Sequence, residues 1–180
     1  DILCDISEDL FAAANDLTLT GTVGGNVVGA GGTITVSGTV DGDLIVAGGT
    51  VTVDSTATIT GDVLVFSGTT KLLGIVGGKV TVYTGALVLN GPVTGDVIAQ
   101  TDQVTLGDAA TIGGSLKGTV GQPLGIDADG KIAGTIDVTI EASQSSSLGS
   151  LGALSNLTAL SALSVIYAIL TALVMGLLLI

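Results

Sequence analysis

Most of this chain is one short phrase repeated at a regular interval. Gly42-Asp43-Leu44, Gly61-Asp62-Val63 and Gly95-Asp96-Val97 are three copies of its beginning. The residue at the Asp position of this phrase marks each unit, and these markers are separated by 17, 17, 19, 17, 17 and 19 positions: Asp9, Asn26, Asp43, Asp62, Lys79, Asp96 and Ser115. So short and strict a period predicts a solenoid, in which each unit forms one coil.

Within each unit, apolar residues alternate with Thr, Ser or Asp. The clearest copy runs Gly-Asp-Leu-Ile-Val-Ala-Gly-Gly-Thr-Val-Thr-Val from Gly42 to Val53. A period of two is typical of a strand with one buried face, and Gly-Gly, Ser-Gly or Asn-Gly interrupts each run. We therefore predict the order strand, corner, strand, corner, strand in each coil. The additional residues of the 19-residue units fall at residues 55–58 and 108–111, where a corner can bulge outward.

Composition supports this fold class. The chain has 180 residues with 29 Gly, 2 Pro, 2% aromatic and 47% hydrophobic residues, which is too apolar for disorder and too rich in glycine for a helical bundle. A single coil cannot cover its own aliphatic layer, so the coils must stack and hydrogen-bond to one another. We predict an all-β, single-stranded β-solenoid of about six to seven coils over residues 9–141, after an N-terminal extension of residues 1–8.

The charge is strongly negative, with 16 acidic and 4 basic residues and a net charge of -12. Binding to nucleic acid is excluded because phosphates require Lys and Arg. The acidic excess indicates a solvated surface, and adaptation to high salt is the open alternative.

After Glu141 the composition changes. Residues 142–156 are rich in Ser, Gly and Leu and read as a linker, and residues 157–180 form an apolar segment without a charged residue. As a helix, these 24 residues would reach about 36 Å, enough to cross a hydrocarbon core of about 30 Å. A membrane anchor, a processed C-terminal signal and a helix buried within an assembly are the alternatives.

Three features near the termini bear on location. The chain begins at Asp1, which fits a cleaved secretory signal or a segment of a longer protein. Cys4 is the only cysteine, so it either forms a disulfide between subunits or remains an unpaired thiol. Asn156-Leu157-Thr158 matches the glycosylation sequon, which makes Asn156 a candidate glycosylation site. We expect a location in the cell envelope or outside the cell.

Enzyme chemistry has little support. The chain has no His, which excludes Ser-His-Asp and Cys-His catalysis and metal sites that contain His. The phosphate-loop-like run at residues 29–32 lacks the Lys-Ser/Thr ending, and Asp127-Ala128-Asp129-Gly130 lacks the outer carboxylates of a calcium loop. We expect no catalytic site, cofactor, metal or nucleotide, and interpret these motifs as a corner and a turn.

The marker residues would stack at one corner of the solenoid. Adjacent carboxylates about 4.8 Å apart repel by about 1 kcal/mol in water. Asn26 and Lys79 each separate two acidic markers and so relieve this repulsion. We interpret the column as a solvated corner ladder; a row of cation sites or a substrate-binding strip is the functional alternative.

The architecture predicts association of identical chains. A solenoid ends in a coil with unpaired backbone groups and an open aliphatic layer, and polar caps usually cover both. Only residues 1–9 precede the first regular coil, which is too short for such a cap. The expected assembly interface consists of the terminal layers: Leu10, Leu17 and Leu19 at one end, and Ile132, Ile136, Val138 and Ile140 at the other.

The repeated Gly-Asp-Leu/Val, Val-Ala-Gly-Gly-Thr-Val-Thr-Val and Gly-Thr-Val phrases between Leu10 and Ile140 resemble those of bactofilins and related polymer-forming proteins. This resemblance implies a right-handed β-helix that forms filaments without nucleotide. The chain departs from bactofilins in its acidity, its start at Asp1 and its apolar C-terminal segment. It also resembles, more weakly, the protein sheaths of some archaea.

The sequence therefore predicts a non-enzymatic structural protein. It would polymerise with itself into a filament, sheath or other cell-envelope assembly, with a membrane contact through residues 157–180. The alternatives are a bactofilin-like scaffold at the membrane and a membrane-tethered carbohydrate-binding or adhesive module. The last would require a strip of exposed aromatic residues, and the chain has only Phe11, Phe66, Tyr83 and Tyr167.

Overall fold

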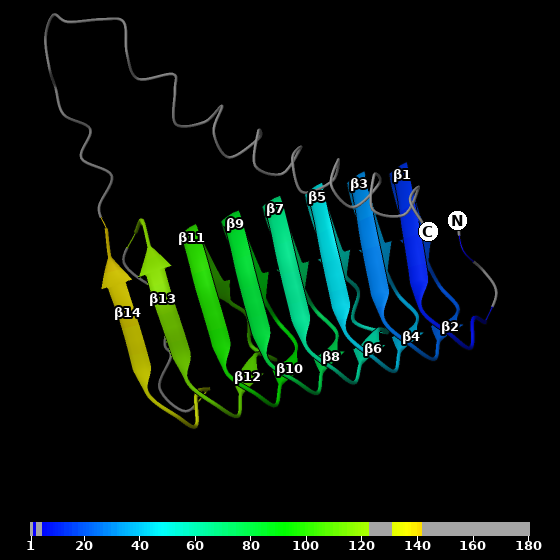
Figure 1. Cartoon of the computed structure of the whole chain (residues 1–180). Coiled ribbons are helices and arrows are strands. Elements are labelled where there is room, and N and C mark those ends of the chain that lie inside the picture. Colours follow the sequence, from blue (N-terminus) through cyan, green and yellow to red (C-terminus); the bar gives the residue numbers. More distant parts are fainter. Residues whose placement is uncertain (1, 3–4, 123–130, 142–180) are drawn as a thin grey trace, which may run out of the picture. The chain divides into compact units, whose positions relative to one another are not determined.

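The computed structural model describes residues 2, 5–122 and 131–141, and these residues form a parallel β-solenoid of about seven turns (Figure 1). Each of the first six turns contributes one strand of ten residues and one strand of two residues, and β13 and β14 have five residues each. The strands are β1 (Leu10–Leu19), β2 (Thr22–Val23), β3 (Val27–Val36), β4 (Thr39–Val40), β5 (Leu44–Val53), β6 (Thr58–Ile59), β7 (Val63–Leu72), β8 (Ile75–Val76), β9 (Val80–Leu89), β10 (Pro92–Val93), β11 (Val97–Leu106), β12 (Thr111–Ile112), β13 (Leu116–Val120) and β14 (Ile136–Ile140).

The strands form two parallel sheets. The long strands make an eight-stranded sheet in the order β1-β3-β5-β7-β9-β11-β13-β14, and the short strands make a six-stranded sheet in the order β2-β4-β6-β8-β10-β12. Each strand thus pairs with the equivalent strand of the next coil. The predicted all-β solenoid of stacked coils is confirmed for the described residues.

The register shows where the longer coils place their additional residues. Val53 pairs with Val36 of the preceding coil, whereas Thr58 pairs with Thr39, so the extra residues lie between Val53 and Thr58. There the Ala57 N–H donates to the Asp54 carbonyl at 2.9 Å and closes a turn. The predicted bulge at this corner is confirmed, and the second 19-residue step bulges equivalently between Leu106 and Thr111.

The long strands differ from the prediction of three strands in each coil. In β5, Leu44 and Val46 face the core, and then the inward positions shift to Val51 and Val53. This shift of five positions marks a bend at Gly48 and Gly49. Pairing continues through the bend because all neighbouring strands bend at the same place. We call the part of a long strand before the bend the first limb, the part after it the second limb, and the short strand the third face.

The core is a stack of aliphatic layers, with Leu, Ile, Val and Ala at the inward positions. Three buried threonines interrupt it: Thr70, Thr84 and Thr101. Thr70 is fully buried in register with Val51 and Leu87, and its hydroxyl lies 2.6 Å from the Ser67 hydroxyl, which in turn lies 3.0 Å from that of Thr84. Because these hydroxyls bind one another, no buried polar side-chain atom among the described residues lacks a partner.

Several sequence predictions concern residues outside the described part. These are Cys4, the Asp127–Gly130 turn, the linker of residues 142–156 with Asn156, and the apolar segment of residues 157–180. In residues 2, 5–122 and 131–141, no helix is long and apolar enough to cross a membrane.

Candidate assembly site

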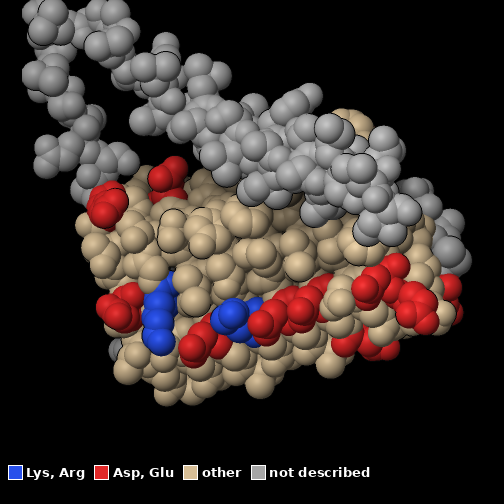
Figure 2. Space-filling view, in the orientation of Figure 1, with Lys and Arg blue, Asp and Glu red and all other residues tan. Residues whose placement is uncertain are grey.

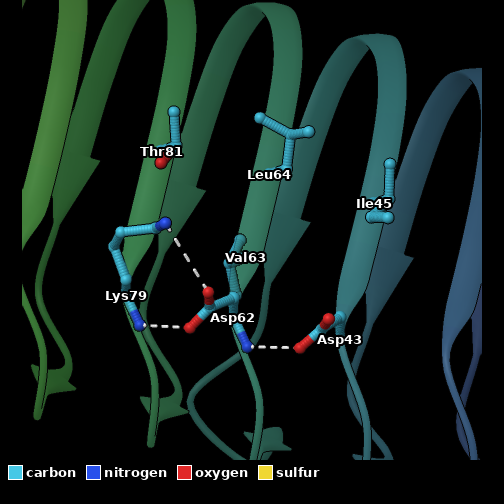
Figure 3. A pocket seen from close by; sticks show the side chains of 7 residues that line it. All are labelled: Asp43, Ile45, Asp62, Val63, Leu64, Lys79 and Thr81. Atoms are coloured by element: carbon cyan, nitrogen blue, oxygen red, sulfur yellow. Dashed lines mark hydrogen bonds and ion pairs between the residues drawn. The ribbon is translucent and has the colours of Figure 1, made fainter.

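The marker residues form hydrogen bonds between coils at one corner. The Asn26 N–H donates to Asp9 Oδ1 at 2.7 Å, and the Asp43 N–H donates to Asn26 Oδ1 at 2.9 Å. The Asp62 and Lys79 N–H groups donate to Asp43 Oδ1 and Asp62 Oδ1, both at 2.8 Å (Figure 3). Ser115 and Thr135 continue the series, since the Ser115 N–H donates to Asp96 Oδ1 at 2.7 Å and the Thr135 N–H to Ser115 Oγ at 3.2 Å. We call this series the corner ladder.

The corner ladder explains why glycine precedes every marker after Asp9. A Cβ atom on Gly61 would collide with Asp43 Oδ1, and one on Gly78 would collide with Asp62 Oδ1. The absence of a side chain therefore leaves room for the carboxylate of the coil below. The Gly-Asp phrase is thus one structural unit: the aspartate reaches the next coil, and the glycine of that coil admits it.

Lys79 interrupts the corner ladder because its side chain has no acceptor atom. Among the described residues, no oxygen accepts a hydrogen bond from the Asp96 N–H. Lys79 Nζ instead lies 3.7 Å from Asp62 Oδ2, and Lys117 Nζ lies 3.9 Å from Asp96 Oδ2. Figure 2 shows acidic side chains in a row along this edge of the solenoid, with Lys side chains among them.

The geometry of the corner gives the marker side chains a structural role. One carboxylate oxygen of each acidic marker already accepts a backbone N–H, and in the described part of the chain no group of three acidic or thiol side chains could hold a metal ion. A shallow hollow of about 210 Å³ lies beside the ladder, between Asp62 and Lys79 on one side and Ile45 and Leu64 on the other (Figure 3). This volume is below the range of about 300–1,000 Å³ of ligand pockets.

At the N-terminal end, the structure separates the predicted interface residues. Leu10 is half-buried, whereas Leu17 and Leu19 are 6% and 2% exposed and belong to the core. The reason is that Ile2 pairs with Leu19, and its N–H donates to the Thr18 carbonyl at 2.7 Å. Substituting Leu17 or Leu19 would therefore affect folding as well as any contact.

The residues before β1 have a role that was not predicted. Ile2 and Ile6 continue the coil by pairing with Leu19 and Val23, and both pack against the core. The period could have revealed them, because each lies one 17-residue step before its partner. The N-terminal extension is thus part of a coil as far as the structure describes it.

At the C-terminal end, the predicted residues lie together on an open layer. Ile136 and Ile140 of β14 are 49% and 51% exposed, and Val138 between them is half-buried. Ile132 is half-buried and forms a parallel bridge with Ile112 on the third face. In the same register columns one coil earlier, Leu116 and Val120 are each 1% exposed.

The aromatic side chains of the described residues lie on the outward flank of the first limbs. Phe11 is exposed, and Phe66 stacks on Tyr83 of the next coil with ring centroids 5.0 Å apart. The two stacked rings cover each other, so they do not form an open platform of the kind that binds sugar rings.

Comparisons with protein families, curated proteins and solved structures give no match for this chain. The structure supports a parallel β-solenoid of the kind found in polymer-forming proteins, and the resemblance to bactofilins in particular rests on the repeated phrases alone.

Proposed function

We propose that this protein is a non-enzymatic structural protein that assembles with itself, end to end, into a filament, sheath or other polymer of the cell envelope. The observation that carries the proposal is the open aliphatic layer of β14. Its side chains occupy core positions, yet about half of the surface of Ile136 and of Ile140 is exposed. A further strand on β14 would bury this surface, with a gain of about 25 cal/mol for each Å² of apolar area.

The other end of the sheet offers a suitable partner. β1 is the opposite edge strand of the eight-stranded sheet, and its Leu10 and Ala12 are only half-buried. Leu10 belongs to the same register column as Ile136, because each strand of the sheet pairs with the next in register. A second copy stacked on β14 would therefore place its Leu10 over Ile136 and its Ala12 over Val138.

The contact between these two ends joins different surfaces and is therefore heterologous. Repetition of such a contact gives an open polymer unless the rotation closes a ring. The corner ladder also supports a structural role, since its side chains bind the backbone of the next coil. The hydrogen bonds and the aliphatic core of the solenoid would then run in one direction along the polymer.

Electron microscopy of end variants tests the proposal. Ile136→Asp and Ile140→Asp place a charge on the open layer and should abolish filaments while leaving the circular dichroism spectrum of a β protein. Thr139→Asp is the matched control, because Thr139 lies on the same strand but faces outward in register with Thr119. Filaments of normal length from Ile136→Asp protein would overturn the proposal, as would an absence of filaments from the unaltered protein at all concentrations.

We further propose that residues 157–180 either hold the polymer at a membrane or pack within it. The support is the length of this segment and the absence of charged residues in it. Deletion of residues 157–180 should release the protein from vesicles in a flotation assay if the segment is an anchor. Loss of filaments on deletion would instead assign the segment to the assembly.

A further inference from the structure

In the described part of the chain, a partial coil lies at each end of the solenoid, and the two partial coils have different parts. Before β1, Ile2 occupies the second limb and Ile6 the third face of a coil that has no first limb among the described residues. Asp5 belongs to the same partial coil, and its Oδ1 accepts the Thr22 N–H at 2.9 Å. The N-terminal end thus presents the end of a second limb and a third face.

The C-terminal end presents the part that is missing. β14 pairs with β13, which is a first limb, and Val138 and Ile140 lie in register with Gly118 and Val120. After Glu141 the structure describes no second limb or third face for this last coil. Among the described residues, the last coil therefore has the first limb, and the N-terminal partial coil has parts of the other two faces.

We propose that, in the polymer, the last coil of one subunit and the first partial coil of the next are one shared coil. This inference rests on the proposed end-to-end assembly and adds its geometry: β14 supplies the first limb, and the partner copy supplies the second limb and third face. The shared layer would contain five inward aliphatic side chains: Ile136, Val138 and Ile140 from one copy, and Ile2 and Ile6 from the other. By register, Ile136, Val138, Ile2 and Ile6 take the columns of Leu44, Val46, Val53 and Ile59 in the coil of β5 and β6, and Ile140 takes the column of Gly48 at the bend.

The shared coil requires that all subunits point the same way. A first limb must be followed by a second limb. A joint between two C-terminal ends would bring together two first limbs, and a joint between two N-terminal ends would have no first limb.

Acidic residues lie on both sides of this joint. β14 carries Asp137 on its outward face, followed by Glu141, and the other end carries Asp5, Glu8 and Asp9. Glu8 occupies the position at which other coils have the glycine that leaves room for a ladder side chain. At the joint, the Thr135 hydroxyl of one copy therefore cannot bind the backbone beside Glu8 of the next copy, and the corner ladder is interrupted there. Aliphatic contact and strand pairing would thus stabilise the joint, and repulsion between the acidic side chains would oppose it. Salt should promote assembly because it screens charges over a Debye length of about 10 Å at 0.1 M.

The first test is the axial repeat of filaments of the unaltered protein. With a shared coil, each subunit adds eight layers, one for each strand of the long sheet, and at about 4.8 Å for each layer the repeat is about 38 Å. If the partial coils stack as separate layers, each subunit adds one layer more and the repeat is about 43 Å. Cryo-electron microscopy of the filament distinguishes these values. A repeat of about 43 Å would overturn the shared coil and leave the proposed polymer intact.

The second test is a disulfide across the joint. Thr139 and Ala13 belong to one outward register column, so the shared coil places Thr139 of one copy about 4.8 Å from Ala13 of the next, within the usual Cα range of disulfides of about 4.4–6.8 Å. In a Cys4→Ser background, a mixture of Ala13→Cys chains and Thr139→Cys chains should form mixed dimers on oxidation. Chains that carry both substitutions should form covalent oligomers at multiples of the monomer mass.

Three controls make the result decisive. Each single variant must first form filaments, and neither should cross-link with itself; dimers of Ala13→Cys chains alone would indicate a head-to-head joint and overturn the inference. Phe11→Cys is the register control for Ala13→Cys. The Cα of Phe11 lies two residues away from that of Ala13 along β1, so the Phe11→Cys chain should cross-link to Thr139→Cys at least several-fold less. Filaments without mixed dimers would also overturn the shared coil, whereas a lack of any filaments would overturn the proposed function itself.

Discussion

β5 and β14 both have aliphatic residues in the first two inward columns of the first limb and yet differ in burial. Leu44 in β5 is 0% exposed, and Ile136 in the same column of β14 is 49% exposed. The difference is that β5 lies between β3 and β7, whereas β14 pairs only with β13 in the described structure. A coil of this solenoid is therefore buried by its neighbours and not by its own folding, as expected of a quasi-one-dimensional repeat protein.

Truncation of one side chain in each coil would test this comparison most directly. Leu44→Ala should lower the free energy of unfolding by about 2–5 kcal/mol, because it leaves a cavity between two covered layers. Ile136→Ala should cost less than about 1 kcal/mol in unassembled protein, since its side chain is already half solvated. Urea unfolding followed by circular dichroism, at concentrations too low for assembly, measures both values. Equal losses would mean that the end coil is covered after all.

A methyl group at the corner would show whether the neighbouring coil also dictates the Gly-Asp phrase. Gly61→Ala should destabilise the protein by about 1–3 kcal/mol through overpacking against Asp43 Oδ1 and the Gly42 carbonyl. Gly95→Ala is the matched control, because a Cβ there meets backbone atoms of the coil below but no ladder side chain. The Gly61 variant should be the less stable of the two in thermal unfolding, and the reverse order would contradict this account of the glycine.

Removing one ladder side chain would measure the polar part of the contact between middle coils. Asp43→Ala leaves the Asp62 N–H without its acceptor and should cost about 1–2 kcal/mol in the free energy of unfolding. Asp43→Asn should retain most of the stability, because Asn26 already fills a ladder position with an amide oxygen. If the alanine and asparagine variants unfold at the same urea concentration, the hydrogen bond has no net effect on stability.

The smallest effect is expected where the corner ladder is interrupted. Lys79→Asn supplies an acceptor for the Asp96 N–H and should raise stability by up to about 1 kcal/mol. The gain is offset by loss of the exposed ion pair with Asp62, which contributes about 0–1 kcal/mol. Lys79→Gln is the control that removes the same charge with a side chain of different reach. A Gln variant as stable as the Asn variant would argue against a restored ladder bond.

The period of the sequence was sufficient to predict the coils, their parallel stacking and the bulged corners, because register in a solenoid follows directly from repeat length. The continuity of the long strands was not predictable, since Gly-Gly reads as a break and only the equivalent bend in the neighbouring strands keeps the pairing. The burial of Leu17 and Leu19 was also missed, because it depends on Ile2 and Ile6, which lie before the first clear repeat.

The corner ladder was predicted as a column but not as a set of hydrogen bonds. A column of Asp and Asn reads equally well as a solvated row of charges, because the sequence does not show where each carboxylate points. One signal was available: the glycine of each coil stands beside a carboxyl, amide or hydroxyl side chain of the coil below, except at Gly95, where that neighbour is Lys79. Such pairing between consecutive units indicates contact through space.

The two bulged corners also mark places where the chain could accept foreign sequence. Residues between Val53 and Thr58 and between Leu106 and Thr111 already vary in number while the strands on either side stay in register. A peptide inserted at Ser55-Thr56 would project from the rod without passing through the aliphatic layers or the ends. Every subunit of a polymer would then display the inserted peptide at the equivalent position. The solenoid would serve as a scaffold that presents inserted peptides at regular spacing.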